Sequence, residues 1–437
     1  IAFNHAFGRN PMVRMWMNDP DGDGWGEPSS ESPYFNQVAT HSYSVGNDFN
    51  HQQARTKTYV KRVVKHWIEE YKIDGFRWDY PKYFETPNLD KMAKNGVKAK
   101  SMQPSYPTKT FPNHYSIATG LYPDHHGIVN NNFYDPTSQK IFTLKNESKK
   151  NSEFYGGNPI WNLAEEQGVK AACFYWPGSD TGVKSASIFK EYDESVSYEN
   201  RVNTVIDWLN LPEAERPHLI TLYFDQPDET GHNHGPLSEE NKKMVPKVDA
   251  VIGQLMQKLD ALPIGKEINL IVVSDHGMVP ISNDKKVALL EYLKPEWLGY
   301  AAVINPIMSI EAKPAYKDSI ANALKKVPHI KWYPSSKVPK RLHFGTNPRA
   351  LDFVIEAKKG YSLVNKRDQK IIGGTHGYDN KMKEMQAIFY AKGPNFKTGK
   401  KVKPFRNVSV YPLIAAILGL KTEVIDGDFD EVKSMLK

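Results

Sequence analysis

The sequence contains a single cysteine, Cys173, among 437 residues. One thiol excludes an intramolecular disulfide, a cysteine-ligated zinc site and an iron–sulfur cluster. Long apolar runs are also missing, and none approaches the roughly 20 residues of a membrane-spanning helix. The sequence therefore predicts no transmembrane segment. The chain opens on Ile1 with no charged-then-apolar leader, so the residues by themselves predict no signal peptide.

A dense tract of basic residues is absent as well. The 57 basic residues are interleaved with 50 acidic ones, which leaves a formal net charge of +7. We therefore expect no specific nucleic-acid partner, whereas a small anionic substrate remains compatible with the charge. The length suits one large α/β domain with an insertion, or two or three ordinary domains. The residues indicate no oligomeric state.

The middle of the chain has a pattern of apolar and polar residues that is typical of an α/β fold. Two apolar runs end in polar residues, "HLITLYFDQPD" and "INLIVVSDHGM". Such runs are typical of buried parallel strands whose C-terminal ends deliver side chains to a site. Residues 280–370 carry lysines, prolines and short mixed elements, which predict an inserted lobe. Upstream, we expect loops in residues 1–52, a helix within 53–72 and a short strand around 73–78.

The stretch "PTKTFPNHYSIATGLYP" places a threonine at the predicted start of a helix. Thr110 is a good N-cap residue, and the proline two residues later is favoured in a first helical turn. A phosphoryl group on its hydroxyl would be stabilised by the backbone N–H groups and the helix dipole. An ordinary capping threonine would look the same, so this stretch alone leaves both interpretations open.

Three further stretches offer oxygen and nitrogen ligands for metal ions. In "DQPDETGHNHGP", Asp228 and His232 are four residues apart, a spacing at which both can reach one divalent ion. In "VVSDHGM", Asp275 and His276 end an apolar strand, and Gly277 allows the chain to break there. His376 lies between glycines in "GGTHGYDN". A solvated acidic loop and a solvated histidine are the alternatives for single stretches.

Considered together, these residues favour phosphoryl transfer. The ligand set contains carboxylates and imidazoles but no sulfur, and a hydroxyl at a helix start completes it. Threonine is a weak nucleophile that direct zinc coordination would activate. Two ions can also hold the attacking and leaving oxygens of a phosphorus centre in line.

The chain resembles the nucleotide pyrophosphatase/phosphodiesterase family of the alkaline phosphatase superfamily over residues 74–437. The resemblance rests on six words that occur in the family's order: "DGFRWDY", "PTKTFPNHYSIATGLYPDHHGIVNNNFYDP", "FYWPGSD", "YFDQPDETGHNHGP", "VVSDHGM" and "GGTHGYDN". It implies an alkaline-phosphatase-like fold, in which helices flank a central, mostly parallel sheet. It also implies a zinc-dependent enzyme exported to the periplasm or the extracellular space.

The same resemblance assigns roles to individual residues. It makes Thr110 the nucleophile and implies two zinc ions, one held by Asp74, Thr110, Asp275 and His276, the other by Asp228, His232 and His376. Asn131 would donate to a phosphate oxygen beside the Thr110 backbone. Phe111 and Tyr192 would sandwich a nucleobase. The resemblance gives no metal role to His114 and His234.

Residues 1–79 resemble a different family, the amylase-type glycoside hydrolases. In that family the second aspartate of "KIDGFRWD", here Asp79, would be the nucleophile, with Arg77 beside it. That chemistry needs a second carboxylate and a complete barrel, and the downstream chain follows the phosphodiesterase pattern instead. We therefore expect an amylase-like fragment in residues 1–73, partly irregular and partly helical, and a phosphodiesterase domain in residues 74–437.

The sequence thus predicts zinc-dependent hydrolysis of phosphodiester and pyrophosphate bonds in small nucleotide substrates. A lipid or choline phosphodiesterase on the same scaffold is one alternative. An amylase-like glycosidase and a binding protein with a catalytically dead site are the others.

Overall fold

The computed structural model describes residues 17–18, 27–28, 84–182 and 184–437. The chain divides into two compact units, residues 1–82 and residues 83–437. In the first unit, β1 (Met17–Asn18) pairs antiparallel with β2 (Glu27–Pro28). The helix predicted within 53–72, the strand predicted around 73–78, and both Asp74 and Asp79 lie outside the described residues.

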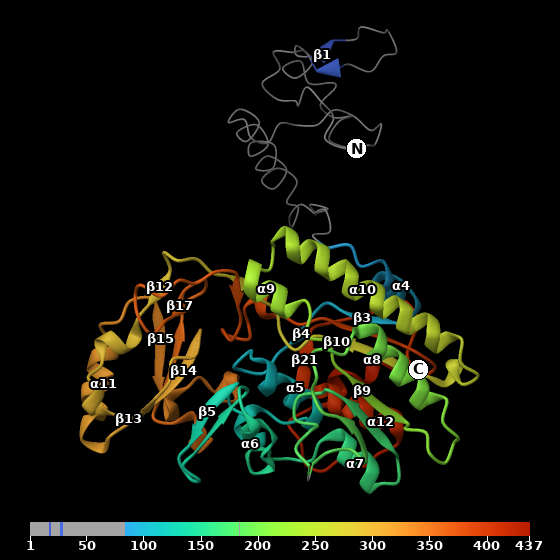
Figure 1. Ribbon diagram of the computed structural model, residues 1–437, viewed down its shortest axis with the longest axis horizontal. Helices are drawn as coiled ribbons and strands as arrows, with labels where there is room; N and C mark the ends of the chain where they lie inside the picture. The colour runs from blue at the N-terminus through green and yellow to red at the C-terminus, as the bar shows by residue number, and fades with distance from the viewer. Residues whose placement is uncertain (1–16, 19–26, 29–83, 183) are drawn as a thin grey trace. The chain divides into compact units, whose positions relative to one another are not determined.

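The second unit is an α/β structure (Figure 1). Its helices are α4 (Pro87–Asn95), α5 (Thr110–Thr119), α6 (Pro123–His126), α7 (Ile160–Glu166), α8 (Tyr198–Leu209), α9 (Asp228–His234), α10 (Glu239–Asp260), α11 (Lys317–Leu324) and α12 (Val410–Leu418). Among the described helices, none combines the length and the apolar composition needed to cross a membrane.

Two sheets form the core of this unit. The first contains β10 (Leu270–Val273), β19 (Phe389–Lys392), β3 (Val97–Ala99) and β20 (Lys400–Val402), in that order. The second places β7 (Ala171–Phe174) between β8 (Ile188–Lys190) and β9 (Leu219–Leu222), and all three run parallel. In the first sheet β20 is parallel to β3, whereas β19 runs antiparallel to both of its neighbours. The α/β prediction is therefore confirmed, with β19 as an antiparallel element.

The same helices cover both core sheets. On one face, apolar residues of α8 and α10 pack against Ile220 and Leu222 of β9 and against Leu270 of β10. On the other face, α5 and α12 contact both β7 and β10. Burial of these apolar side chains is the main force that holds the layers together.

The two predicted buried strands form as β9 and β10, but they are less buried than expected. All four residues of β10 are only half-buried, as are three of the four in β9. Within the described residues, β9 pairs only with β7 and β10 only with β19, so each strand has one edge without a partner.

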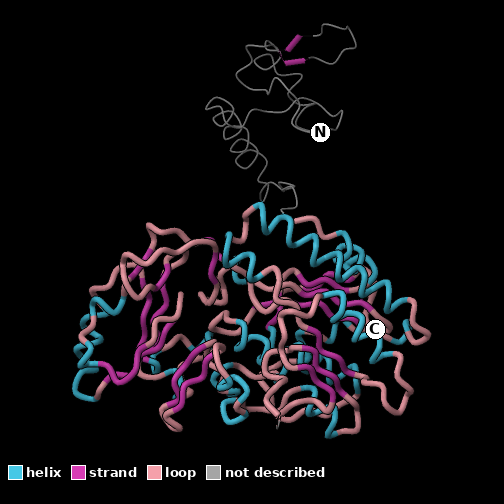
Figure 2. The backbone as a smooth tube through the Cα atoms, viewed as in Figure 1, coloured by secondary structure: helices cyan, strands magenta, loops and turns pink. Residues whose placement is uncertain are grey.

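A separate antiparallel sheet lies in the range where the lobe was predicted. Its order is β13 (Leu298–Ala301), β14 (Ile307–Ala312), β16 (Phe353–Ala357) and β15 (Ile330–Pro334). Helix α11 packs on it through Ile320 and Leu324. Figure 2 shows these strands as a group apart from the core strands.

Short strand pairs connect the remaining parts. They are β4 (Met102–Gln103) with β21 (Phe405–Arg406), β5 (Asn132–Asp135) with β6 (Lys140–Thr143), β11 (Val279–Pro280) with β18 (Gly374–Thr375), and β12 (Lys286–Val287) with β17 (Ser362–Leu363). The β5–β6 hairpin shares an apolar cluster with the lobe, in which Phe133 of β5 joins Ile307 and Val354.

Candidate functional site

The hydroxyl of Thr110 is free of a capping role. Helix α5 begins at Thr110 itself, and the cap position is Lys109, whose side chain makes no capping hydrogen bond. The prediction that Thr110 is the N-cap is therefore wrong by one residue. Thr110 is the first residue of the helix, and its Oγ1 lies 3.4 Å from Nε2 of His276. The ordinary-cap alternative loses its basis.

A buried asparagine fixes the start of α5. The side chain of Asn113 donates to the carbonyl oxygens of Pro107 and Lys109, at 2.9 and 2.8 Å. Its Oδ1 accepts from the backbone N–H of Ser105 and from the amide of Asn407. With every polar atom of this buried amide satisfied, the first turn of α5 has a defined position.

Three histidines present the same nitrogen to a common space. Nδ1 lies at a backbone carbonyl in each: His276 at Gly277, His376 at Thr108 and His232 at Gly374, at 3.0, 2.8 and 2.9 Å. A carbonyl oxygen only accepts, so each Nδ1 carries a hydrogen, which leaves Nε2 of His232 and of His376 with a lone pair. Nε2 of His276 lies 2.9 Å from the Asp275 carboxylate.

The lone pairs of His232 and His376 face each other closely. Nε2 of His376 lies 3.0 Å from Nε2 of His232. Two lone pairs at that distance repel unless a cation or a proton lies between or beside them. Histidine ligands of metals typically have their second nitrogen fixed in this way by a hydrogen bond. The arrangement therefore fits a bound cation.

Two carboxylates complete the cluster. Oxygens of Asp228 lie 3.4 Å from Nε2 of His232 and 3.8 Å from Nε2 of His376. Oδ2 of Asp275 lies 2.9 Å from Nε2 of His276. One ligand atom each from Asp228, His276 and His376 falls within a group no wider than 4.8 Å. Oxygen and imidazole donors without sulfur suit Zn²⁺.

The structure thus brings together six of the seven predicted metal ligands, and the seventh, Asp74, lies outside the described residues. The family resemblance assigns the ligands to two zinc ions, but the structure does not separate the two groups of ligands clearly. The tight group of Asp228, His276 and His376 takes members from both sets. The rings of His276 and His376 stack with centroids 3.5 Å apart, so the two sets are in direct contact.

Charge in the cluster favours an ionised Asp275 beside a neutral His376. Burial acts to lower the pKa of His276, but the carboxylate of Asp275 outweighs it and raises that pKa. Burial acts to raise the pKa of Asp275, but the neighbouring His276 and His114 outweigh it and lower that pKa to about 2. Burial, together with His276 and Lys109, holds the pKa of His376 well below its ordinary value. At neutral pH, Asp275 is an anion and His376 a neutral imidazole, which are the forms that bind a metal.

Two residues at this site were not singled out as functional from the sequence. His114 follows Thr110 by one helical turn, and its Nδ1 lies 3.0 Å from the carbonyl of Thr110 and 3.4 Å from Asp275. Lys109 is buried, and its ammonium donates to the carbonyl of Asn305 in the lobe. The i, i+4 spacing from Thr110 could have indicated His114. No local sequence pattern predicts that Lys109 contacts Asn305.

The predicted substrate-binding residues lie around the first turn of α5 and at the end of the parallel sheet. Oδ1 of Asn131 accepts from the backbone N–H of Phe111 at 2.9 Å, which leaves its NH₂ group available as a donor. The ring of Phe111 contacts Phe142. Tyr192 is 42% exposed, and its ring lies 5.2 Å from that of Tyr175. No ring contact between Phe111 and Tyr192 exists within the described residues, so the slot between them stays a prediction.

Comparison with known proteins places these observations in a family. The model of the "Type I phosphodiesterase / nucleotide pyrophosphatase" family matches residues 72–379. The venom phosphodiesterase CdcPDE of Crotalus durissus collilineatus is 39% identical over 384 residues, which is 84% of this chain and 46% of that protein. Ectonucleotide pyrophosphatase/phosphodiesterase family member 1 of Mus musculus is 40% identical over 383 residues, 84% of this chain and 42% of that protein. The chain spans about half the length of these relatives.

Solved structures give the same result. Murine ectonucleotide pyrophosphatase/phosphodiesterase 5 superimposes with a TM-score of 0.78 and 33% identity, over 83% of this chain and 98% of that one. An inactive variant of the same murine protein in complex with AMP also has a TM-score of 0.78, over 84% of this chain. These similarities confirm the predicted alkaline-phosphatase-like fold class.

Proposed function

The chain belongs to the type I phosphodiesterase/nucleotide pyrophosphatase family, and we propose that it hydrolyses phosphodiester and pyrophosphate bonds of nucleotides. The proposal includes two zinc ions and a phospho-threonine intermediate on Thr110. One observation carries it: the Thr110 hydroxyl lies at the start of α5 without a capping role, 3.4 Å from an imidazole nitrogen of the ligand cluster.

The chemistry follows from the positions of the chain's own groups. Zinc, when bound by the cluster, supplies Lewis acidity that lowers the pKa of the hydroxyl and neutralises charge on the phosphoryl oxygens. Oγ1 of Thr110 attacks phosphorus, and the bond from phosphorus to the leaving oxygen breaks. Water then attacks the phospho-threonine and releases Thr110. The N-terminus of α5 stabilises the phosphoryl group through the N–H of Thr110 and the helix dipole, since the N–H of Phe111 is bonded to Asn131 and Pro112 has none.

Substrate positioning falls to groups near the first turn of α5. The free NH₂ of Asn131 donates to a phosphoryl oxygen. Phe111 and Tyr192 bind the nucleobase by stacking. The AMP bound to the structurally similar murine protein supports a nucleotide over a choline ester. The venom and ectoenzyme names of the relatives support an exported enzyme.

Metal dependence is the test of this proposal. The protein should contain two zinc ions per chain, chelation should abolish hydrolysis of the nitrophenyl ester of thymidine 5′-phosphate, and added zinc should restore it. Zinc should also raise the melting temperature of stripped protein, because it binds only the folded site. His232→Ala should lower zinc content. His234→Ala is the matched control, since His234 is exposed on the same helix and outside the cluster. Full activity in stripped protein would exclude the metal mechanism.

A further inference from the structure

Arg349 of the lobe is a mostly buried cation whose hydrogen-bonding capacity is fully used. Its side chain is 14% exposed, and each N–H of its guanidinium has an acceptor within the protein. Nε and Nη2 donate to Oδ2 of Asp135, at 3.1 and 2.9 Å. Nη1 donates to the carbonyls of Gly127 and Phe154, and Nη2 also donates to that of Glu153. No donor is left for a ligand, so this side chain acts on the protein itself.

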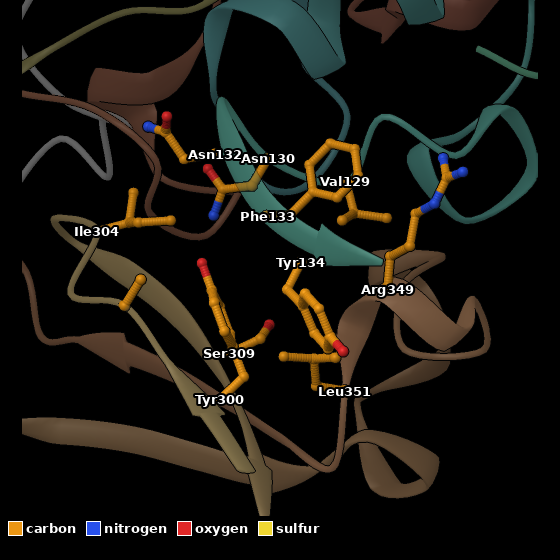
Figure 3. A pocket seen from close by; sticks show the side chains of 11 residues that line it. Val129, Asn130, Asn132, Phe133, Tyr134, Tyr300, Ile304, Ser309, Arg349 and Leu351 are labelled. Atoms are coloured by element: carbon orange, nitrogen blue, oxygen red, sulfur yellow. The ribbon is translucent and has the colours of Figure 1, made fainter. Parts of the chain in front are cut away.

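Two aromatic rings hold the guanidinium in place. Its central carbon lies 5.4 Å from the ring centroid of Phe133 and 5.3 Å from that of Phe154. These are cation–π contacts, which gain strength where the cation is shielded from water. Figure 3 shows the Arg349 side chain at the end of β5, the strand that also carries Phe133. The guanidinium therefore has a defined position relative to β5.

Two of these contacts bracket the segment that carries Asn131. The carbonyl of Gly127 and the carboxylate of Asp135 bind the same guanidinium, and Asn131 lies four residues from each. Between these anchors, Oδ1 of Asn131 accepts from the backbone N–H of Phe111 in the first turn of α5. The position of the Asn131 amide thus depends on a loop that Arg349 closes at both ends.

The chain around Arg349 is also anchored independently of its side chain. The carboxylate of Asp124 in α6 accepts from the backbone N–H groups of Gly345 and Thr346, at 3.0 and 2.6 Å. The side chain of Asn347 donates to the carbonyl of Asp124 at 2.8 Å. Removal of the guanidinium should therefore leave this part of the lobe attached to α6, and its effect should be confined to the loop that carries Asn131.

We propose that Arg349 is a positioning residue for Asn131, so that a side chain of the lobe sets the orientation of the Asn131 amide at the site. The inference rests on the proposed function, in which the NH₂ group of Asn131 donates to a phosphoryl oxygen. Such a donor contributes to catalysis only where it is aimed in advance at the charge that develops. Without the guanidinium the loop would give the amide other orientations, and fewer of them would reach the phosphorus that Thr110 attacks. Arg349 acts through Asn131 and keeps no donor for the substrate.

A double-mutant cycle tests the coupling between the two residues. Asn131→Ala should lower kcat/KM for the nitrophenyl ester of thymidine 5′-phosphate about 100-fold, the lower end of the cost of losing one such donor. Arg349→Ala should lower it about 30-fold in the wild-type background but less than twofold in the Asn131→Ala background, as expected for two residues that act as a unit. Losses that multiply in this cycle would overturn the positioning role.

Two further variants separate positioning from a loss of folding. Millimolar guanidinium should restore part of the activity of Arg349→Ala and none of that of the double variant, whereas an unfolded chain would not respond. Asp135→Asn keeps the size of the partner but removes its charge, and it should show the same non-additivity with Asn131→Ala. Arg367→Ala is the control, because Arg367 pairs with Glu291 on the exposed surface of the lobe. Its effect should be small and equal in both backgrounds.

Amide hydrogen exchange gives a readout that needs no catalysis. The N–H of Phe111 is bonded to Asn131, and that of Asn113 is bonded to Lys109 in the same helix. Arg349→Ala should speed exchange at Phe111 at least tenfold and leave exchange at Asn113 unchanged. Equal exchange at Phe111 in wild type and variant would overturn the positioning role. Wild-type enzyme that cleaves no diester would overturn the proposed function alone, since the exchange result would still decide whether Arg349 positions Asn131.

Discussion

Removal of the Thr110 hydroxyl should abolish catalysis without abolishing metal binding. We expect Thr110→Ala to lower kcat by on the order of 10³-fold or more, because no other group takes over as nucleophile. The remaining ligands should still hold zinc, which metal analysis of the variant would show. Thr110→Ser keeps the hydroxyl and should retain part of the activity. An alanine variant with wild-type turnover would mean that bound water, not Thr110, attacks phosphorus.

Tyr192 permits a test of the nucleobase slot. Its ring is 42% exposed, so truncation should leave the fold intact while it removes a stacking surface worth roughly 1–3 kcal/mol. Tyr192→Ala should raise KM for the nitrophenyl ester of thymidine 5′-phosphate about fivefold or more. KM for bis(nitrophenyl) phosphate, which carries no base, should change much less, and phosphocholine esters should remain poor substrates. Equal losses on the nucleotide and the plain diester would argue against the slot.

Single residues also show what the sequence could and could not reveal. The strand-ending Asp275 and His276 were predictable, because an apolar run followed by Asp-His-Gly marks a strand that stops at a site. Lys109, which precedes Thr110, was not predictable, since its partner is the carbonyl of Asn305, 196 residues away. Burial of this ammonium lowers the pKa of Lys109 to about 7, partly offset by Asp228. Only the folded chain creates that environment.

At the level of elements, α5, β9 and β10 followed from local patterns. The helix α9, which carries Asp228 and His232, and the pairing of the strands did not. The strand positions of β9 and β10 were predictable from apolar runs. Their half-buried state was not, because exposure depends on which strand lies beside each one. The same holds for Glu356 in the middle of β16, which sequence patterning alone would place on the solvent face. It is 5% exposed, and Lys331 lies 4.0 Å away.

Glu356 makes the stability of the lobe sheet depend on pH. Burial raises its pKa from 4.5 to about 7, with a smaller raising effect from Asp379, against the lowering effects of Lys331 and Tyr106. The folded state therefore holds this proton more tightly than the unfolded state. As pH rises from about 4.5 to 7 the unfolded state loses the proton first, so the free energy of unfolding falls, by roughly 3 kcal/mol in total.

Replacing this carboxyl tests the assignment. Glu356→Gln cannot ionise, so the variant should be stabilised relative to wild type at pH 8 much more than at pH 5. Urea denaturation at the two pH values would measure the difference. Glu311→Gln on neighbouring β14 is the matched control, since Glu311 is only half-buried. A pH dependence that is the same in wild type and Glu356→Gln would assign the effect to another group.

For the molecule as a whole, the question is what residues 1–73 contribute. We predict that they take no part in catalysis and form no barrel, because a closed (β/α)₈ barrel needs roughly 250 residues. The sequence before Asp74 reads "WIEEYKI", with Glu69 and Glu70 where the family resemblance implies a strongly apolar strand. In the described residues, β9 and β10 each keep one unpaired edge and half-buried apolar side chains.

An engineered chain would test whether a more apolar strand before Asp74 stabilises the fold. Replacing residues 1–73 with a short apolar strand that leads into Asp74 should raise the free energy of unfolding, since each large aliphatic side chain that becomes buried contributes roughly 1.5–3 kcal/mol. Diesterase activity should be at least that of the full chain. A second version with the same length but alternating serine and lysine is the control, and it should lose the added stability because polar side chains gain nothing from burial. If the apolar version were inactive while the full chain hydrolysed diesters, residues 1–73 would have a catalytic role, and starch-type glycosides would be the substrates to assay next.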